Sequence, residues 1–109
     1  MPHIIVEYSP QLDDQIPALL NDLHETLSAS GIDKVRIKTR GIALNHSVVG
    51  LEGAGGLMMH ATLLILEGRS YDLKKQYADP LYDVLKKAAP NNCAVTLEVR
   101  DMDKETYYL

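Results

Sequence analysis

The chain has 109 residues, of which 46% are hydrophobic, and this length and composition predict one globular domain spanning residues 1–109. Its 15 acidic residues outnumber its 11 basic ones, and the net charge of −4 argues against a nucleic-acid-binding protein, which needs a basic face for phosphate. No apolar run approaches about 18 residues, so no membrane segment is expected, and the first residues lack the pattern of a signal peptide. The single cysteine, Cys93, cannot form an intrachain disulfide, which favours a reducing cytoplasm.

The first half of the chain predicts a strand, a helix and a second strand. Residues 3–8 contain contiguous β-branched side chains, which are typical of a strand covered on both faces. Residues 13–29 carry leucine and isoleucine at helical spacing, so they predict an amphipathic helix that Asp13 or Asp14 can cap. Residues 34–44 alternate apolar and cationic side chains and therefore predict a strand.

The second half repeats this order. After a turn region at 45–56, residues 57–67 are the most apolar stretch of the chain and predict a strand. Residues 71–88 have the apolar spacing of a helix, and Ser70 is positioned to be its N-cap. Residues 93–100 predict the last strand.

This order of elements predicts an α+β fold, in which two βαβ halves form a four-stranded mixed sheet with two helices on one face. The other face would be bare, although the strand at 57–66 is apolar on both sides, and we expect Met58 and Met59 in the core. Other copies of the chain are the simplest cover for such a face, so we expect a homo-oligomer. The tail ends in residues 107–109, which are apolar enough to dock onto the domain.

Pro2 is the first candidate for a catalytic group. It directly follows Met1, and a residue as small as proline at this position normally leads to removal of the methionine. The mature chain then begins with a secondary amine at the start of a buried strand. Desolvation and nearby cations favour the neutral form of such an amine, and they lower its pKa toward the range of a general base. Proline follows methionine in many unrelated proteins, so Pro2 by itself also fits the absence of any catalytic role.

Two groups of cations are candidate ligands for acidic molecules. Arg36, Lys38 and Arg40 lie on one face of the strand predicted at 34–44, where they either bind an anion or form a solvated face. Arg69 lies between a buried strand and a helix start, where helix N–H groups favour anions. Its guanidinium can hold a carboxylate with two hydrogen bonds, bind a carbonyl group, or remain a surface charge.

The histidines do not predict a metal site. His24 and His46 have no partner at metal-ligand spacing, so no metal is expected. His60 lies among apolar neighbours and predicts a hydrogen-bonded core histidine rather than a catalyst. His3 either tunes the amine of Pro2 or merely begins the first strand.

Several motifs resemble one known family when they are taken together. They are the Met-Pro-His-Ile-Ile-Val-Glu-Tyr-Ser opening, Ile-Lys-Thr-Arg at 37–40, His-Ala-Thr-Leu at 60–63, and Gly-Arg-Ser at 68–70 before the second helix. Over nearly the whole chain they resemble the tautomerase superfamily, and within it the family of 5-carboxymethyl-2-hydroxymuconate isomerases. The chain departs from some relatives because it lacks Phe and Trp, so any aromatic ring in the pocket would come from Tyr8 or another tyrosine.

The resemblance implies an isomerase that acts on a small polycarboxylate without a cofactor, as a homotrimer with its active site near the subunit boundary. It implies that Pro2 is the catalytic base and that Arg69 binds the substrate. A second cation is implied from Lys38 or Arg40, and Arg40 is preferred because it keeps the residue type. The implied reaction converts 5-carboxymethyl-2-hydroxymuconate to its 2-oxo-3-ene isomer by proton transfer, in aromatic (homoprotocatechuate) catabolism.

Two other functions stay open on the sequence alone. One is a different activity of the same superfamily, such as a phenylpyruvate-like keto–enol tautomerase or a related decarboxylase. The other is a noncatalytic ligand-binding module with a ferredoxin-like βαβ repeat, which would tolerate a retained Met1 or a blocked terminus. Substrate assays separate the two enzymes, and the state of the N-terminus separates both from the binding module.

Overall fold

A computed structural model describes residues 1–109. The helices and strands follow in the order β1 (His3–Tyr8), α1 (Ile16–Ala29), β2 (Lys38–Ala43), β3 (Leu57–Leu66), α2 (Tyr71–Ala88) and β4 (Cys93–Met102), with short 3-10 helices at Pro10–Gln15, Lys34–Arg36 and Gly50–Glu52. The two βαβ units predicted from the sequence are therefore present. None of the helices is long and apolar enough to cross a membrane.

The four strands form one mixed sheet in the order β2-β1-β3-β4. β1 pairs in parallel with β2, and β3 pairs in parallel with β4. The two inner strands, β1 and β3, run antiparallel to each other. Each helix is thus the crossover that a parallel pair requires, and the two units join through their first strands.

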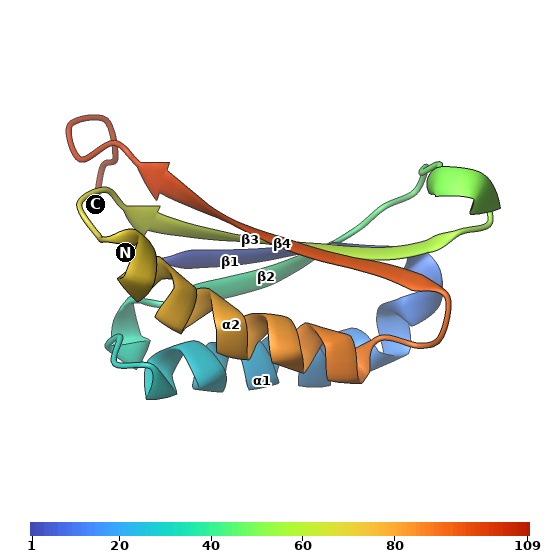
Figure 1. Ribbon diagram of the computed structural model, residues 1–109, viewed down its shortest axis with the longest axis horizontal. Coiled ribbons are helices and arrows are strands. Elements are labelled where there is room, and N and C mark those ends of the chain that lie inside the picture. Colours follow the sequence, from blue (N-terminus) through green and yellow to red (C-terminus); the bar gives the residue numbers. More distant parts are fainter.

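Both helices cover the same face of the sheet, as Figure 1 shows. Side chains alternate along β1 and β3, so every second residue points toward the helices and is buried. The hydrophobic core consists of 17 buried residues: Ile4, Val6, Tyr8, Leu12, Ile16, Leu19, Leu23, Leu27, Ile32, Ile37, Met59, Ala61, Leu63, Ile65, Tyr77, Leu81 and Leu85. The predicted apolar faces of both helices are confirmed by this set.

The opposite face of the sheet is covered by neither α1 nor α2 (Figure 1). Met58 and His60 of β3 lie on this face and are half-buried, so the predictions that both belong to the core are wrong, whereas Met59 is fully buried. The reason is the two-residue period of the strand, which turns the neighbours of a core residue outward. His60 is nevertheless hydrogen-bonded, because its Nδ1 lies 2.7 Å from the hydroxyl of Thr96.

The first helix begins later than its apolar spacing predicts. Residues Pro10–Gln15 form a 3-10 helix, and α1 starts at Ile16 without a side-chain cap. The prediction that Asp13 or Asp14 caps the helix is wrong, because no side chain caps α1, and the Asp13 carboxylate instead accepts a hydrogen bond from the Tyr8 hydroxyl at 2.7 Å. That contact joins the end of β1 to the turn that follows it.

The second strand is also shorter than predicted. Lys34–Arg36 form a 3-10 turn, in which the Asp33 carboxylate accepts a hydrogen bond from the Val35 N–H at 3.2 Å. Val35 is 87% exposed, whereas the prediction placed it within the strand, on the side opposite the cations. A strand needs a neighbour to pair with, and β1 supplies none before His3, which is opposite Lys38.

Ser70 caps α2 as its sequence position predicts, since its hydroxyl accepts a hydrogen bond from the Leu73 N–H at 3.2 Å. We expect Ser70→Ala to lower the free energy of unfolding by about 1 kcal/mol, because this substitution leaves a helix N–H without its partner. Urea unfolding at fixed protein concentration measures the change. Ser47→Ala, in a loop where the serine makes no side-chain hydrogen bond, is the matched control, and equal stability of the two variants would contradict the capping role.

Candidate active site

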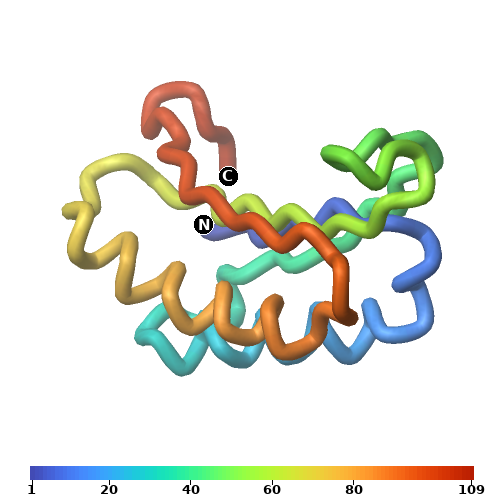
Figure 2. Tube along the Cα trace, turned by 45° about the vertical axis from the view of Figure 1, so that its right-hand side comes forward, coloured from blue at the N-terminus to red at the C-terminus, as the bar shows by residue number.

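The sheet topology gathers candidate residues at one end of the molecule. β1 and β2 begin at this end, and the antiparallel β3 finishes there and leads into α2. Figures 1 and 2 both show the two chain termini and the turn between β3 and α2 at this end. Pro2 is buried immediately before β1, and its carbonyl accepts a hydrogen bond from the Lys38 N–H at 3.1 Å. This hydrogen bond holds Pro2 beside the start of β2, although the two lie far apart in the sequence.

The terminal amine lies within a group of positive charges. In the structure it belongs to Met1, one residue ahead of Pro2. Burial lowers the pKa of this amine below its ordinary value of about 8, and the charges of Arg69, Arg36 and Lys38 lower the pKa further, in that order of strength. The neutral form of an amine at this position is therefore favoured.

Arg69 is half-buried in the turn between β3 and α2. Its Nη1 donates a hydrogen bond to the carbonyl of Leu66 at 3.0 Å, and its Cζ lies 5.9 Å from the centre of the Tyr77 ring. The carbonyl contact that the sequence left open is therefore present. It occupies one nitrogen of the guanidinium and holds the side chain at the end of β3, while the other nitrogens make no hydrogen bond within the chain.

Lys38 and Arg40 of β2 lie on the helix-free face of the sheet, as the alternation predicts. The Lys38 ammonium lies 3.4 Å from the carbonyl of Arg36, and its charge acts on the terminal amine. Arg40 instead places its Nη1 3.0 Å from Nδ1 of His3. Lys38 and Arg40 therefore lie at two different positions beside the start of β1.

His3 connects β1 to both β2 and the C-terminal tail. A guanidinium has only donors, so Nδ1 of His3 accepts from Arg40, and Nε2 carries the proton that it donates to the Tyr107 hydroxyl at 2.7 Å. Burial lowers the pKa of His3, and Arg40, Lys38 and the terminal amine lower the pKa further. The imidazole is thus held in its neutral form.

Two more residues join this group: Arg36, which was predicted as a strand cation, and Tyr107, which the sequence did not single out. Arg36 lies in the turn before β2 rather than on the strand, and its charge still lowers the pKa of the terminal amine. Tyr107 reaches His3 from the far end of the sequence. The apolar last three residues predicted that the tail docks, but they did not indicate where. Tyr107 alone makes the contact, since Tyr108 and Leu109 are 88% and 90% exposed.

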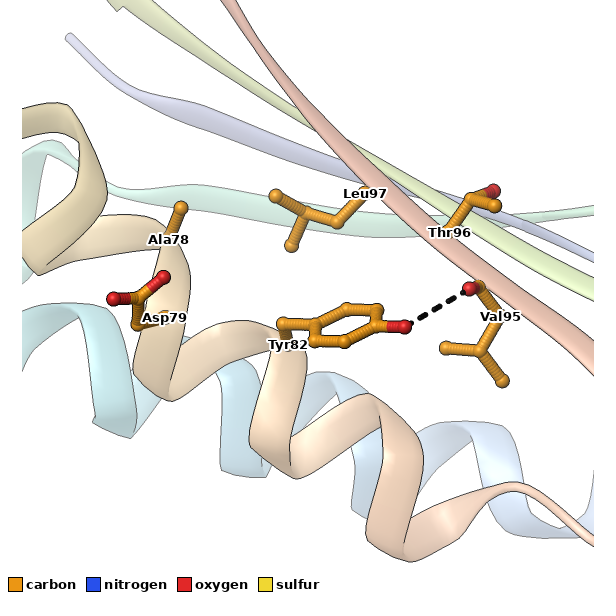
Figure 3. Close-up of a pocket in the computed structure, with 6 residues that line it drawn as sticks. All are labelled: Ala78, Asp79, Tyr82, Val95, Thr96 and Leu97. Atoms are coloured by element: carbon orange, nitrogen blue, oxygen red, sulfur yellow. Dashed lines mark hydrogen bonds between the residues drawn. The ribbon is translucent and has the colours of Figure 1, made fainter. Parts of the chain in front are cut away.

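A separate hollow of about 350 Å³ lies between α2 and the edge strand β4 (Figure 3). Its walls are Ala78, Asp79, Tyr82, Val95, Thr96 and Leu97, and the Tyr82 hydroxyl donates to the carbonyl of Val95 at 3.4 Å. None of the cationic side chains described above lines this hollow. Its one charged side chain is a carboxylate, so the hollow presents no positive charge to an acidic molecule.

The residues at the N-terminal end can support proton transfer on an anion. A desolvated amine among cations has a lowered pKa, so more of it is neutral and able to remove a proton. The cations that lower its pKa also attract carboxylates and stabilise negative charge that develops during a reaction. The same positive charges could therefore assist a base and bind an acidic molecule.

Comparison with known proteins supports the same kind of chemistry. The sequence model of the family described as 5-carboxymethyl-2-hydroxymuconate isomerase matches residues 2–108. No curated protein sequence matches the chain.

Solved structures with the same fold include relatives of that description. A crystal structure of a 5-carboxymethyl-2-hydroxymuconate isomerase from Deinococcus radiodurans R1 superposes with a TM-score of 0.88 at 25% identity, over 99% of this chain and 87% of that one. A 5-carboxymethyl-2-hydroxymuconate delta-isomerase superposes with a TM-score of 0.78 at 16% identity, over 100% and 87% of the two chains. A fused 4-OT described as a symmetric trimer gives 0.74 at 18% identity, over 98% and 90%.

Proposed function

This chain belongs to the 5-carboxymethyl-2-hydroxymuconate isomerase family, and from that premise we propose that it isomerises 5-carboxymethyl-2-hydroxymuconate with the amine of Pro2 as the base. The product is the 2-oxo-3-ene isomer, formed during the breakdown of aromatic compounds such as homoprotocatechuate. The unpaired Cys93 fits the reducing cytoplasm as the site of this reaction.

The reaction needs a group that both accepts and returns one proton. After removal of Met1, the neutral nitrogen of Pro2 takes the proton of the 2-hydroxyl group and leaves a dienolate. The carbonyl forms at C2 as the C2–C3 double bond moves to C3–C4, and the electron pair of the old C4–C5 double bond takes the proton back at C5. No oxidant or second substrate is consumed, so an amine and a set of cations are sufficient.

The observation that supports this proposal most strongly is the environment of the terminal amine. Burial and the charges of Arg69, Arg36 and Lys38 all lower its pKa, which is the change that a base requires. Pro2 is itself buried and fixed through its carbonyl to β2. Its nitrogen would be held at a constant place beside the cations.

Arg69 and Arg40 are the proposed substrate-binding arginines, with Lys38 as the third cation. A substrate with several carboxylates can engage separate cations at once, and each pairing is strengthened because the donor and the acceptor are both charged. Arg69 approaches from the start of α2, whereas Arg40 and Lys38 approach from β2. The substrate would lie between these two elements, at the start of β1.

We further propose that the chain assembles as a homotrimer through the helix-free face of its sheet. Ile5, Leu64 and Leu66 lie half-buried on that face, where no element of the same chain covers them. The fused 4-OT with the same fold is described as a trimer. Sedimentation equilibrium tests this assembly, and a monomer at micromolar concentration would contradict it.

The activity is tested by following the ultraviolet absorbance of the dienol substrate. We expect its rapid loss with the wild-type protein and the appearance of the 2-oxo-3-ene product. Phenylpyruvate provides the parallel assay for a keto–enol tautomerase. Turnover of phenylpyruvate without turnover of the hydroxymuconate would replace the proposed substrate, and no turnover of either would contradict an isomerase of this kind.

The pH profile gives a prediction about the base itself. The amine must be neutral to act, so kcat/KM should rise with pH and level off above the pKa of the amine. Burial and nearby cations lower the pKa of the Met1 amine, one residue ahead of Pro2, from its ordinary value of about 8, and the same surroundings should place the midpoint of the rise below about 8. Lys38→Met removes one of the cations and should move the midpoint to higher pH, whereas Lys87→Met, at the far end of α2, should leave it in place. An unshifted midpoint for Lys38→Met would contradict this electrostatic role.

A further inference from the structure

The C-terminal tail is built to return to the start of the chain. After β4, the N–H of Tyr107 donates to the carbonyl of Asp103 at 3.0 Å, which closes a turn. The N–H of Lys104 donates to the carboxylate of Glu67 at 2.8 Å and fixes this turn to the end of β3. In Figure 2 the red tail folds back so that its end lies next to the N-terminus.

The ring of Tyr107 meets His3 edge to face. Their centroids are 5.8 Å apart with an angle of 79° between the planes, and the hydroxyl lies 2.7 Å from Nε2. His3 is half-buried, and it immediately follows the proposed base. The tail therefore contacts the site through a single side chain.

Three side chains form one chain of hydrogen bonds: Tyr107, His3 and Arg40. The proton on Nε2 is held by the tyrosine oxygen, so Nδ1 is left as the acceptor that faces the guanidinium. Apart from this contact, the Arg40 guanidinium makes no hydrogen bond within the chain, and Arg40 is exposed. Its position therefore depends on the orientation and tautomer of one imidazole ring.

We propose that Tyr107 is a positioning residue for the isomerisation: it fixes the tautomer of His3, and His3 in turn holds the Arg40 guanidinium where a substrate carboxylate binds. This inference rests on the function proposed above and extends it to the C-terminal tail. The tyrosine acts through His3 and does not touch the substrate itself.

The charges around His3 give this arrangement a pH dependence. Arg40 and Lys38 act on the ring from β2, the terminal amine of Met1 acts on it from just ahead of β1, and the Tyr107 hydroxyl contacts it from the tail. Burial and these cations lower the pKa of His3 below its ordinary value of about 6.5. The ring therefore stays neutral to a lower pH than an unperturbed histidine does. Protonation at lower pH turns Nδ1 into a donor, so the contact with Arg40 is lost and KM should rise.

The first test compares Tyr107→Phe with Tyr108→Phe on the hydroxymuconate substrate. Tyr107→Phe keeps the ring contact but removes the hydroxyl, so we expect KM to rise about two- to tenfold, the value of one hydrogen bond, with kcat nearly unchanged. Tyr108→Phe removes an exposed hydroxyl from the same tail and should leave both constants as in the wild type. Equal losses in the two variants would mean that the tail acts only through its general folding.

The second test uses His3→Asn, in which the side-chain oxygen replaces Nδ1 as the acceptor for Arg40. No group of the shorter asparagine reaches Tyr107. In the His3→Asn protein, Tyr107→Phe should cause no further rise in KM, because the Tyr107 hydroxyl acts on Arg40 only through the His3 ring. The rise of KM at low pH should also disappear.

Nitrogen NMR of the His3 ring gives a readout that needs no substrate. We expect a protonated Nε2 and an unprotonated Nδ1 at neutral pH, and a change of tautomer or a mixture in Tyr107→Phe. If the wild type isomerises the substrate but Tyr107→Phe keeps its KM, or if Nδ1 carries the proton, the positioning role is overturned and the proposed function stands. If the wild type turns over no hydroxymuconate, both proposals fall.

Discussion

Retention of Met1 should lower kcat by about 10²- to 10⁴-fold, the contribution that a general base typically makes. With Met1 in place, the nitrogen of Pro2 is part of a peptide bond and has no lone pair available for a proton. The amine that remains on Met1 lies one residue away from the proposed position of the base. The fold should be unaffected, because Met1 precedes the first strand.

The comparison can be made on one preparation. Protein produced while methionine aminopeptidase is inhibited is assayed, treated with purified aminopeptidase, and assayed again, with the intact mass recorded at both stages. Activity should appear in step with the loss of one methionine. Full activity of the Met1 form would remove Pro2 from the mechanism, and the circular dichroism spectrum before and after treatment shows whether folding has changed.

Arg69→Ala should lower kcat/KM by about 10- to 100-fold, the cost of losing a hydrogen bond between charged groups. KM should rise because a carboxylate loses its partner, and kcat should fall if the same guanidinium also stabilises the dienolate. The pKa of the Pro2 amine should rise as well, because among the nearby charges Arg69 lowers the pKa of the neighbouring Met1 amine most. This third effect would move the pH profile and distinguishes Arg69 from a residue that only binds.

Two further variants make the Arg69 result specific. Arg69→Lys keeps the charge but loses the planar pair of donors, so its activity should lie between that of Arg69→Ala and the wild type. Lys87→Ala removes one exposed positive charge from the last turn of α2 and should have little effect. Kinetic constants for Arg69→Ala that match those of Lys87→Ala would exclude Arg69 from the site.

The sequence predicts the elements of this fold well because their signals are local. The β-branched run at 3–8 and the apolar spacing of 71–88 each define an element without reference to the rest of the chain. The cap at Ser70 is likewise a matter of adjacent residues, and it is confirmed. The number of strands and the two crossover helices then restrict the fold to few arrangements.

The predictions that are wrong depend on contacts between distant residues. Asp13 resembles a helix cap, but Tyr8 approaches it only after β1 and the following turn have packed. Val35 fits an alternating strand, but the register of β1 against β2 ends at His3 and leaves it no partner. Local spacing contains no information about where a neighbouring strand begins.

The same distinction applies to the candidate site. Pro2 and Arg69 are recognisable from their positions relative to a strand and a helix. The contact between His3 and Tyr107 spans almost the whole chain, and only the turn after β4 brings it about. The role of Arg36 similarly depends on the turn before β2, which the strand prediction did not include.

The two βαβ units meet where their first strands, β1 and β3, pair antiparallel. This arrangement gives the chain an approximate internal two-fold axis. Under that rotation the entrance to β1 corresponds to the entrance to β3, which lies at the opposite end of the sheet. At β3, however, Leu57 is linked to Gly56 by an ordinary amide, so its nitrogen is not basic. After removal of Met1, two geometrically equivalent corners would therefore contain a single main-chain amine between them, and a reagent that inactivates the enzyme by modifying this amine should need one equivalent per polypeptide.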